Sequence, residues 1–138
     1  MLNDEMGPIV IVATSSIAVN PQPPKFDLDE RTAKFAEQVI FLAKRIPNST
    51  INEVLIRQFV KSGTSIGANY GEANDAESKK DFRHKIGICK KESKETKYWL
   101  RLIAAAEPSL REDAATQWQE AKELNLIFGK IIRSCDAK

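Results

Sequence analysis

The stretch "SGTSIGANYGEA", residues Ser62–Ala73, decides the fold, because it holds three glycines at a constant spacing of four: Gly63, Gly67 and Gly71. On a helix, this spacing places all three glycines along one stripe. A phosphate-binding loop instead needs four residues between its glycines, a Lys-Ser/Thr pair after them and a strand before them, and none of these is present. The stretch therefore predicts a helix with a face of small residues.

Three glycines weaken this helix, since each loses about 0.8–1 kcal/mol relative to alanine in a helix interior. Close approach of a neighbouring helix would offset that loss, and a kinked or frayed end after Ile66 is the alternative. Asn69 shares a seam with Phe59 and Ile66 and is expected to point inward, with Glu72 one turn later on nearly the same side. Buried polar residues in a bundle usually fix the register of packing, so both are expected to be structural.

Helical periodicity extends outward from this stretch in both directions. Apolar residues recur on one face from Leu28 to Ile46, from Phe82 to Ile103 and from Ala114 to Cys135. No segment has sustained strand alternation, and the connections are short. The sequence predicts an all-α fold, an antiparallel up-down four-helix bundle. Residues that can cap or end helices stand at its boundaries: Pro47, Ser49 or Thr50, Ser78 with Asp81, Pro108 and Ser109.

The length of 138 residues predicts one domain, with residues 25–138 forming the bundle and residues 1–24 a flexible N-terminal tail. Within the tail, Gly7–Val19 is apolar but follows Asp4 and Glu5, and no Lys or Arg occurs before Lys25, so it does not resemble a secretory signal. It is also too short to span a bilayer. We expect a cytoplasmic protein, in which both cysteines are reduced thiols.

The basic charge of the chain is concentrated in one segment. Residues 78–101 carry nine basic and three acidic groups, whereas the whole chain has a net charge of only +2. On the expected helix, six of the cations step by three or four, with Gly87 filling one gap, along a stripe about 33 Å long opposite the apolar face, and Lys80, Lys85 and Lys91 broaden it. The nine candidates for contact with nucleic acid are Lys79, Lys80, Arg83, Lys85, Lys90, Lys91, Lys94, Lys97 and Arg101.

Two interpretations of this stripe remain open. A run of charge is most often a solvated helix face, but few acids interleave with these cations, since Glu92 and Glu95 lie toward the core edge. Unpaired cations in a row are typical of a protein that binds a polyanion through its phosphates. Tyr98 and Trp99 are adjacent in sequence, so their side chains should diverge, and no base-stacking platform is evident.

Catalytic and metal-binding patterns are lacking in the sequence. His84 is the only histidine, no Glu-x-x-His motif for a di-iron bundle occurs, and no nucleophile motif is present. We expect neither an enzyme nor a bound cofactor or metal.

Three quoted segments together resemble a known family. They are "FDLDERTAKFAEQVIFLAKRIP" (Phe26–Pro47), the glycine stretch, and "SKKDFRHKIGICKKESKETKYWLRLI" (Ser78–Ile103). The chain resembles the bacterial four-helix bundle proteins also called S23 ribosomal or 23S rRNA intervening-sequence proteins. The accessory variability determinant protein of diversity-generating retroelements is a structural cousin of that family.

The resemblance implies a homopentameric ring of antiparallel four-helix bundles with a positive surface and no known catalysis. The retroelement cousin binds nucleic acid and a reverse transcriptase, so RNA, DNA or such a protein is an expected partner. The family's recurring polar positions, and the aromatic residues beside them, imply contacts between helices or subunits. These structural or interface candidates, together with Gly63 and Gly67, are Asn69, Glu72, Glu92, Glu95, Tyr98 and Trp99.

Two functional hypotheses follow. The first is a non-enzymatic oligomer that binds RNA or another nucleic acid through the basic face of its third helix. The second is an oligomeric adaptor that binds proteins and makes no direct contact with nucleic acid.

Overall fold

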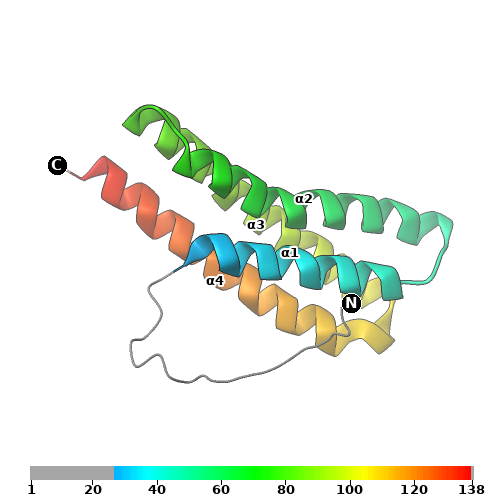
Figure 1. Cartoon of the computed structure of the whole chain (residues 1–138). Coiled ribbons are helices and arrows are strands. Elements are labelled where there is room, and N and C mark those ends of the chain that lie inside the picture. Colours follow the sequence, from blue (N-terminus) through cyan, green and yellow to red (C-terminus); the bar gives the residue numbers. More distant parts are fainter. Residues whose placement is uncertain (1–26, 138) are drawn as a thin grey trace, which may run out of the picture.

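Four helices make up most of the protein in the computed structural model, which describes residues 27–137. The helices are α1 (Leu28–Arg45), α2 (Thr50–Asn74), α3 (Lys79–Ala106) and α4 (Arg111–Asp136), with a short 3₁₀ turn, η1 (Pro108–Leu110), before α4 (Figure 1). Residues 27–137 contain no strand, so the predicted all-α class is confirmed. The tail expected over residues 1–24 lies outside the described residues.

Side chains cap three of the four helices. Asp27, Ser49 and Ser78 each accept a hydrogen bond from the backbone N–H three residues later, at 3.0–3.2 Å. Each cap satisfies one of the N–H groups that a helix start leaves without a partner. The cap of α2 is therefore Ser49 rather than Thr50.

The start of α4 differs from the expectation that Ser109 caps it. Ser109 lies inside η1, and α4 begins at Arg111 without a side-chain cap. Pro108 stands at the first position of η1, where its missing N–H and fixed φ are best tolerated. Because this turn leads directly into α4, the cap predicted at Ser109 is wrong.

The core forms where one face of each helix turns inward. Phe59, Phe128 and Leu42 are among its largest fully buried side chains. Burying a side chain of this size contributes roughly 1.5–3 kcal/mol. Two buried hydroxyls pair across the interface of α2 and α3, where Thr96 Oγ1 lies 2.9 Å from Ser62 Oγ.

The glycine stripe of α2 packs closely on α1 at two of its three positions. A Cβ atom on Gly63 would lie 2.7 Å from Val39 Cγ2, and one on Gly67 would lie 3.1 Å from Thr32 Oγ1. A Cβ on Gly71 would meet nothing within 4 Å, so the predicted close approach does not extend to this residue. Since α2 continues to Asn74, the alternative of a frayed end after Ile66 is wrong.

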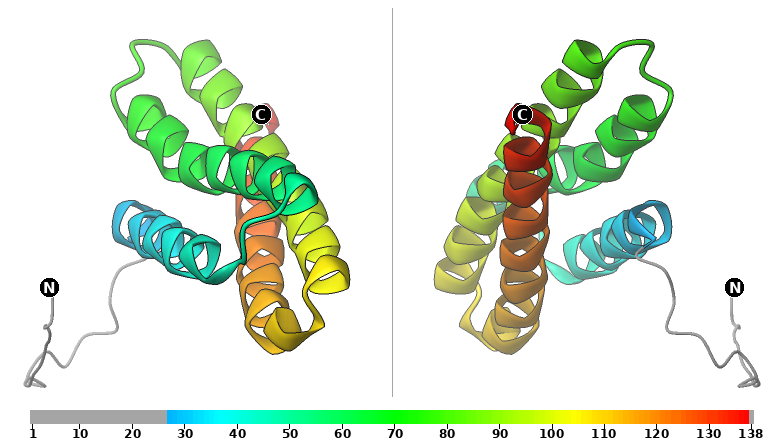
Figure 2. Two further views of the ribbon diagram at one scale, coloured as in Figure 1. Left: turned by 90° about the vertical axis from the view of Figure 1, so that its right-hand side faces the viewer. Right: turned by 90° about the vertical axis from the view of Figure 1, so that its left-hand side faces the viewer.

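The four helices do not pack equally. Figures 1 and 2 show α4 beside α3, whereas α1 crosses α4 at an angle. Ion pairs bridge α1 and α4: Arg31 makes a bidentate contact with Glu120 at 2.7 and 2.8 Å, and Arg45 lies 2.7 Å from Asp113. We call this set, which also includes Glu123 at 2.9 Å from Arg31, the α1–α4 seam.

Candidate nucleic-acid interface

Helix α3 presents nine cations on the sides that do not face the core. Its buried residues are Ile86, Cys89, Ser93, Thr96, Leu100 and Ile103. The cations lie between these positions, and all are exposed except Lys85 and Lys97, which are half-buried. We call the following set the α3 cation row: Lys79, Lys80, Arg83, Lys85, Lys90, Lys91, Lys94, Lys97 and Arg101.

Two members of the α3 cation row are neutralised by carboxylates. Arg83 contacts both carboxylate oxygens of Asp136 at 2.6 and 2.8 Å, and this hydrogen bonding lowers the pKa of Asp136. Lys85 lies 2.6 Å from Glu72 on α2, and the hydrogen bond raises the pKa of Lys85. Within residues 27–137 the other seven cations make no ion pair, so most of the positive charge remains unneutralised.

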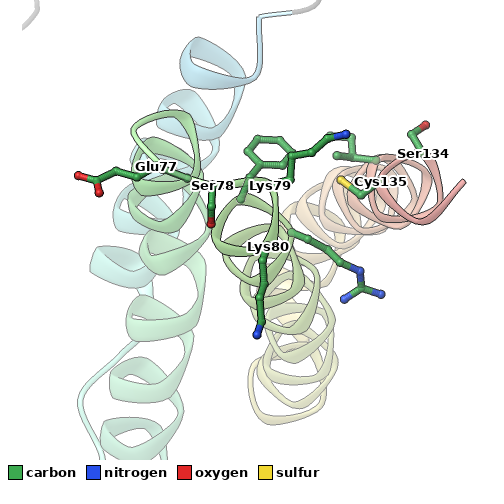
Figure 3. A pocket seen from close by; sticks show the side chains of 10 residues that line it. Glu77, Ser78, Lys79, Lys80, Ser134 and Cys135 are labelled. Atoms are coloured by element: carbon green, nitrogen blue, oxygen red, sulfur yellow. The ribbon is translucent and has the colours of Figure 1, made fainter. Parts of the chain in front are cut away.

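The surface beside the start of α3 is hollowed. This N-terminal hollow, of about 860 Å³, is lined by the α2–α3 turn, the first turn of α3 and the end of α4. Figure 3 shows Ser78 and Lys79 opposite Ser134 and Cys135, while Lys80 points in a different direction from Lys79. Arg83 also lines the hollow, so three members of the α3 cation row surround it.

A second hollow, of about 450 Å³, lies halfway along α3. This central hollow is lined by Gly87, Lys90, Lys91, Lys94 and Lys97 of α3 and by Asn125 of α4. The Asn125 Nδ2 group donates to the Lys90 carbonyl at 2.9 Å and to Ser93 Oγ at 3.1 Å, which ties α4 to α3. Four lysines therefore surround a rigidly held amide.

The aromatic residues near the α3 cation row are already in contact with other groups. The ammonium groups of Lys97 and Lys122 lie over the Trp118 ring, 5.2 and 5.7 Å from its centroid. Tyr98 and Trp99 meet edge to face, with their centroids 5.0 Å apart. The rings do not diverge as expected from adjacent residues, since they pack against one another.

Of the polar structural candidates, Glu72 and Glu95 are exposed, whereas Asn69 and Glu92 are half-buried. Asn69 is half-buried rather than fully inward, and its Nδ2 donates to the Ser65 carbonyl of its own helix at 2.8 Å. It stands at the edge of the seam because Ser62, Ile66 and Ala73 fill the centre. Burial raises the pKa of Glu92, and the nearby Glu95 raises it further.

The site residues predicted from the sequence include none from α4, although α4 contributes to this surface. Trp118, Lys122, Asn125 and Gly129 step by four, three and four, which places them along one edge of α4. That register was visible in the sequence, but its relevance depends on knowing that this edge lies against α3.

The described residues include neither a metal-binding cluster nor a helix that could span a membrane. No group of three His, Cys, Asp or Glu side chains is placed to hold a metal ion in the range 27–137. None of the helices described is long and apolar enough to cross a membrane.

Together, the fold and this surface define a class of protein: a small helical bundle whose cations gather along the edge shared by two helices. Residues 25–133 match the family described as 23S rRNA-intervening sequence protein, and the chain belongs to this family. No match is found among curated proteins.

A solved structure supports the assignment. It is the crystal structure of a protein of unknown function from the S23 ribosomal protein family of Bacteroides thetaiotaomicron, 36% identical in sequence with a TM-score of 0.71. The similarity covers 77% of this chain and 98% of the other.

Proposed function

We propose that this chain is a non-enzymatic, oligomeric protein that binds RNA or another nucleic acid through the α3 cation row. The observation that carries the proposal is the set of seven cations that make no ion pair within the described part of the chain. Neutralising phosphates with such cations releases condensed counterions, which supplies affinity without reading sequence. The family description names a 23S rRNA intervening sequence, which makes RNA the first ligand to test.

The hollows favour a ligand over a merely solvated face. A solvated run of lysines needs no concave surface, whereas a phosphate backbone gains from cations that converge on it from several directions. Lys90, Lys94 and Lys97 border the central hollow together with Asn125 from the neighbouring helix. Hydrogen bonds from Asn125 hold α4 against α3, so this arrangement is formed before any ligand arrives.

The antiparallel up-down order of helices and a homopentameric ring are part of the same proposal, as is a cytoplasmic location. Contacts between helix ends support the antiparallel order. Asn74 at the end of α2 donates a hydrogen bond to Asp29 at the start of α1, at 3.2 Å, and Arg83 near the start of α3 donates one to Asp136 at the end of α4. A ring would repeat the α3 cation row in every subunit. Such repetition raises avidity without any new contact.

A protein-binding adaptor is the second candidate, because apolar side chains remain exposed on α2. Ile51 is 68% exposed and Val54 is 48% exposed, and both are on α2. An acidic protein could also bind the α3 cation row, and a reverse transcriptase is the protein partner that the resemblance suggests. The two candidates differ in whether the purified oligomer retains nucleic acid at low salt.

The test is binding of labelled RNA, followed by fluorescence anisotropy at low salt. Changing Lys90, Lys94 and Lys97 together to Glu should weaken binding by about a hundredfold or more, since each contact with a phosphate becomes repulsive. A matched control changes Lys34, Lys44 and Lys130 to Glu, which alters net charge equally at exposed lysines outside α3. Equal affinity of the two variants would contradict the proposal.

A further inference from the structure

We infer that the central hollow distinguishes RNA from DNA through Asn125, whose side-chain carbonyl accepts a hydrogen bond from a ribose 2′-hydroxyl while the surrounding lysines hold the neighbouring phosphates. This inference rests on the proposed function and deepens it. It assigns a discriminating role to a residue of α4 that lies outside the α3 cation row.

Hydrogen bonding fixes the orientation of the Asn125 amide. The Lys90 carbonyl, 2.9 Å away, can only accept, so the group facing it must be the NH₂ group. The Ser93 hydroxyl donates to the same carbonyl at 2.8 Å, which leaves its oxygen to accept from Asn125 at 3.1 Å. The two acceptors are only 2.8 Å apart and lie on one side of Nδ2, so these contacts fix which end of the amide faces Lys90 and Ser93.

The Asn125 carbonyl is the acceptor of this amide that is left for a ligand. No donor within residues 27–137 bonds to Oδ1, and this atom is not among the buried acceptors that lack a partner, so it remains accessible. The side chain lines the central hollow. A carbonyl on the wall of a basic hollow can accept a hydrogen bond from a hydroxyl but repels a phosphate.

The lysines around the hollow set which part of a nucleic acid meets this carbonyl. Lys90, Lys91, Lys94 and Lys97 line the same hollow, and none of them makes an ion pair among the residues described. Contacts with phosphates position a nucleic acid, and the sugar lies between successive phosphates. The 2′-hydroxyl is the group by which a protein tells RNA from DNA at a given site.

Base recognition is not available as an alternative at this hollow. No aromatic residue of the described range 27–137 lines this hollow, and the nearby Trp118 ring is covered by Lys97 and Lys122. Binding of single strands by stacking requires an open aromatic face. The surface is therefore suited to reading the sugar-phosphate backbone, without preference for sequence.

The experiment compares three oligoadenylates of equal length and charge: RNA, DNA and 2′-O-methyl RNA. Neither DNA nor the methylated strand has a 2′-hydroxyl that can donate, and only the methylated strand adds bulk. The wild-type protein should bind RNA about three- to tenfold more tightly than both, the effect expected of one hydrogen bond. Equal affinity for all three would overturn the inference and leave the proposed function standing, whereas failure to bind any of them would overturn both.

A variant of Asn125 distinguishes a role in recognising the 2′-hydroxyl from a role in packing α4 against α3. Asn125→Ala removes the carbonyl and should bring RNA binding down to the level of DNA, with affinity for the other two strands unchanged. If Asn125 only ties α4 to α3, the variant weakens binding of all three strands alike, which contradicts the inference. Gln119→Ala is the matched control, because Gln119 is an exposed amide of α4 that bonds Glu123 on the α1 side. The wild-type comparison remains decisive even if Asn125→Ala fails to fold.

Discussion

The two edges of α4 meet their neighbouring helices in opposite ways. Toward α1, α4 presents Asp113, Glu120 and Glu123, and these acids pair with the arginines of the α1–α4 seam. Toward α3, the same helix presents Trp118, Asn125 and Gly129 along the middle, and its one ion pair with α3 is made by Asp136 at the end. Cations therefore stand on both sides of α4, but α4 neutralises both arginines of the α1–α4 seam and, among the α3 cation row, only Arg83 at its end.

This difference separates charges that hold the protein together from charges that remain available. A bidentate arginine–carboxylate pair that is partly buried stabilises the contact between two helices. Lysines without acidic partners repel one another in the isolated protein, and a polyanion relieves that repulsion. The comparison predicts that changes at the α1–α4 seam alter stability, and that changes at the α3 cation row alter binding.

The largest expected effect is on the salt dependence of RNA binding. Truncating Lys90, Lys94 and Lys97 to Ala should reduce the slope of log K against log salt by about 2, since each contact with a single-strand phosphate contributes about 0.7. Truncating Arg31 and Arg45 should leave the slope unchanged, because their charge is already neutralised. Titrations of RNA at several salt concentrations measure both slopes, and equal losses of slope would show that the two edges do not differ in function.

The next effect concerns the glycine stripe of α2 that packs on α1. Gly63→Ala gains up to about 1 kcal/mol of helix propensity but forces Val39 to move, and overpacking of this kind costs about 1–3 kcal/mol. Gly71→Ala has open space at the added methyl and should raise the free energy of unfolding by up to about 1 kcal/mol. Urea unfolding should give opposite signs for the two variants, with RNA affinity unchanged in both.

These elements also show how much of the fold can be predicted from the sequence. The steps of four between the glycines, the apolar periodicity and the caps at Ser49 and Ser78 are local patterns, so they predict the helices and the face of α3 that carries the cations. Which glycines are approached depends on where α1 crosses α2, and Gly71 lies beyond that contact. No pattern within one helix reveals this.

The candidate site could be predicted only in part, for the same reason. The α3 cation row is visible in the sequence, but its neutralisation depends on other helices: Lys85 is paired because Glu72 of α2 lies beside it, and Arg83 because α4 ends next to it. Asn125 enters the site from α4. The hollows are properties of two helices at once, so they could not be derived from either.

A smaller effect is expected at the α1–α4 seam. Arg31→Ala should lower the free energy of unfolding by about 1 kcal/mol, because a partly exposed ion pair is weaker than a buried one. RNA affinity should not change. Urea unfolding and anisotropy measured on the same preparations test this, and a loss of RNA affinity at constant stability would place Arg31 in the binding surface instead.

We also expect Arg31→Ala to change how the stability of the protein depends on pH in the acidic range. Hydrogen bonds from Gln119 and Arg31 lower the pKa of Glu123 below its usual value of 4.5. A carboxyl whose pKa is lower in the folded state contributes stability above the unfolded pKa and loses it as pH falls through the folded pKa. Stability should therefore decline below about pH 4.5, and less steeply in Arg31→Ala than in the wild type.

The smallest effect is on the reactivity of a thiol. Cys135 is half-buried and lines the N-terminal hollow, whereas Cys89 is buried in the core, where burial raises its pKa to about 12. Because the thiolate is the reactive form, a thiol reagent should modify Cys135 in the folded protein and spare Cys89. Labelling of both residues after unfolding is the control.

Bound RNA should slow the modification of Cys135 a few-fold if the ligand covers the N-terminal hollow, and added salt should restore the rate as the RNA dissociates. A reagent that is small and uncharged avoids repulsion by the phosphates. An unchanged rate under saturating RNA would restrict the contact to the central hollow. Lys79 and Lys80 would then not bind RNA, like the arginines of the α1–α4 seam. The boundary between cations that bind RNA and cations that do not would fall within α3 rather than along α4.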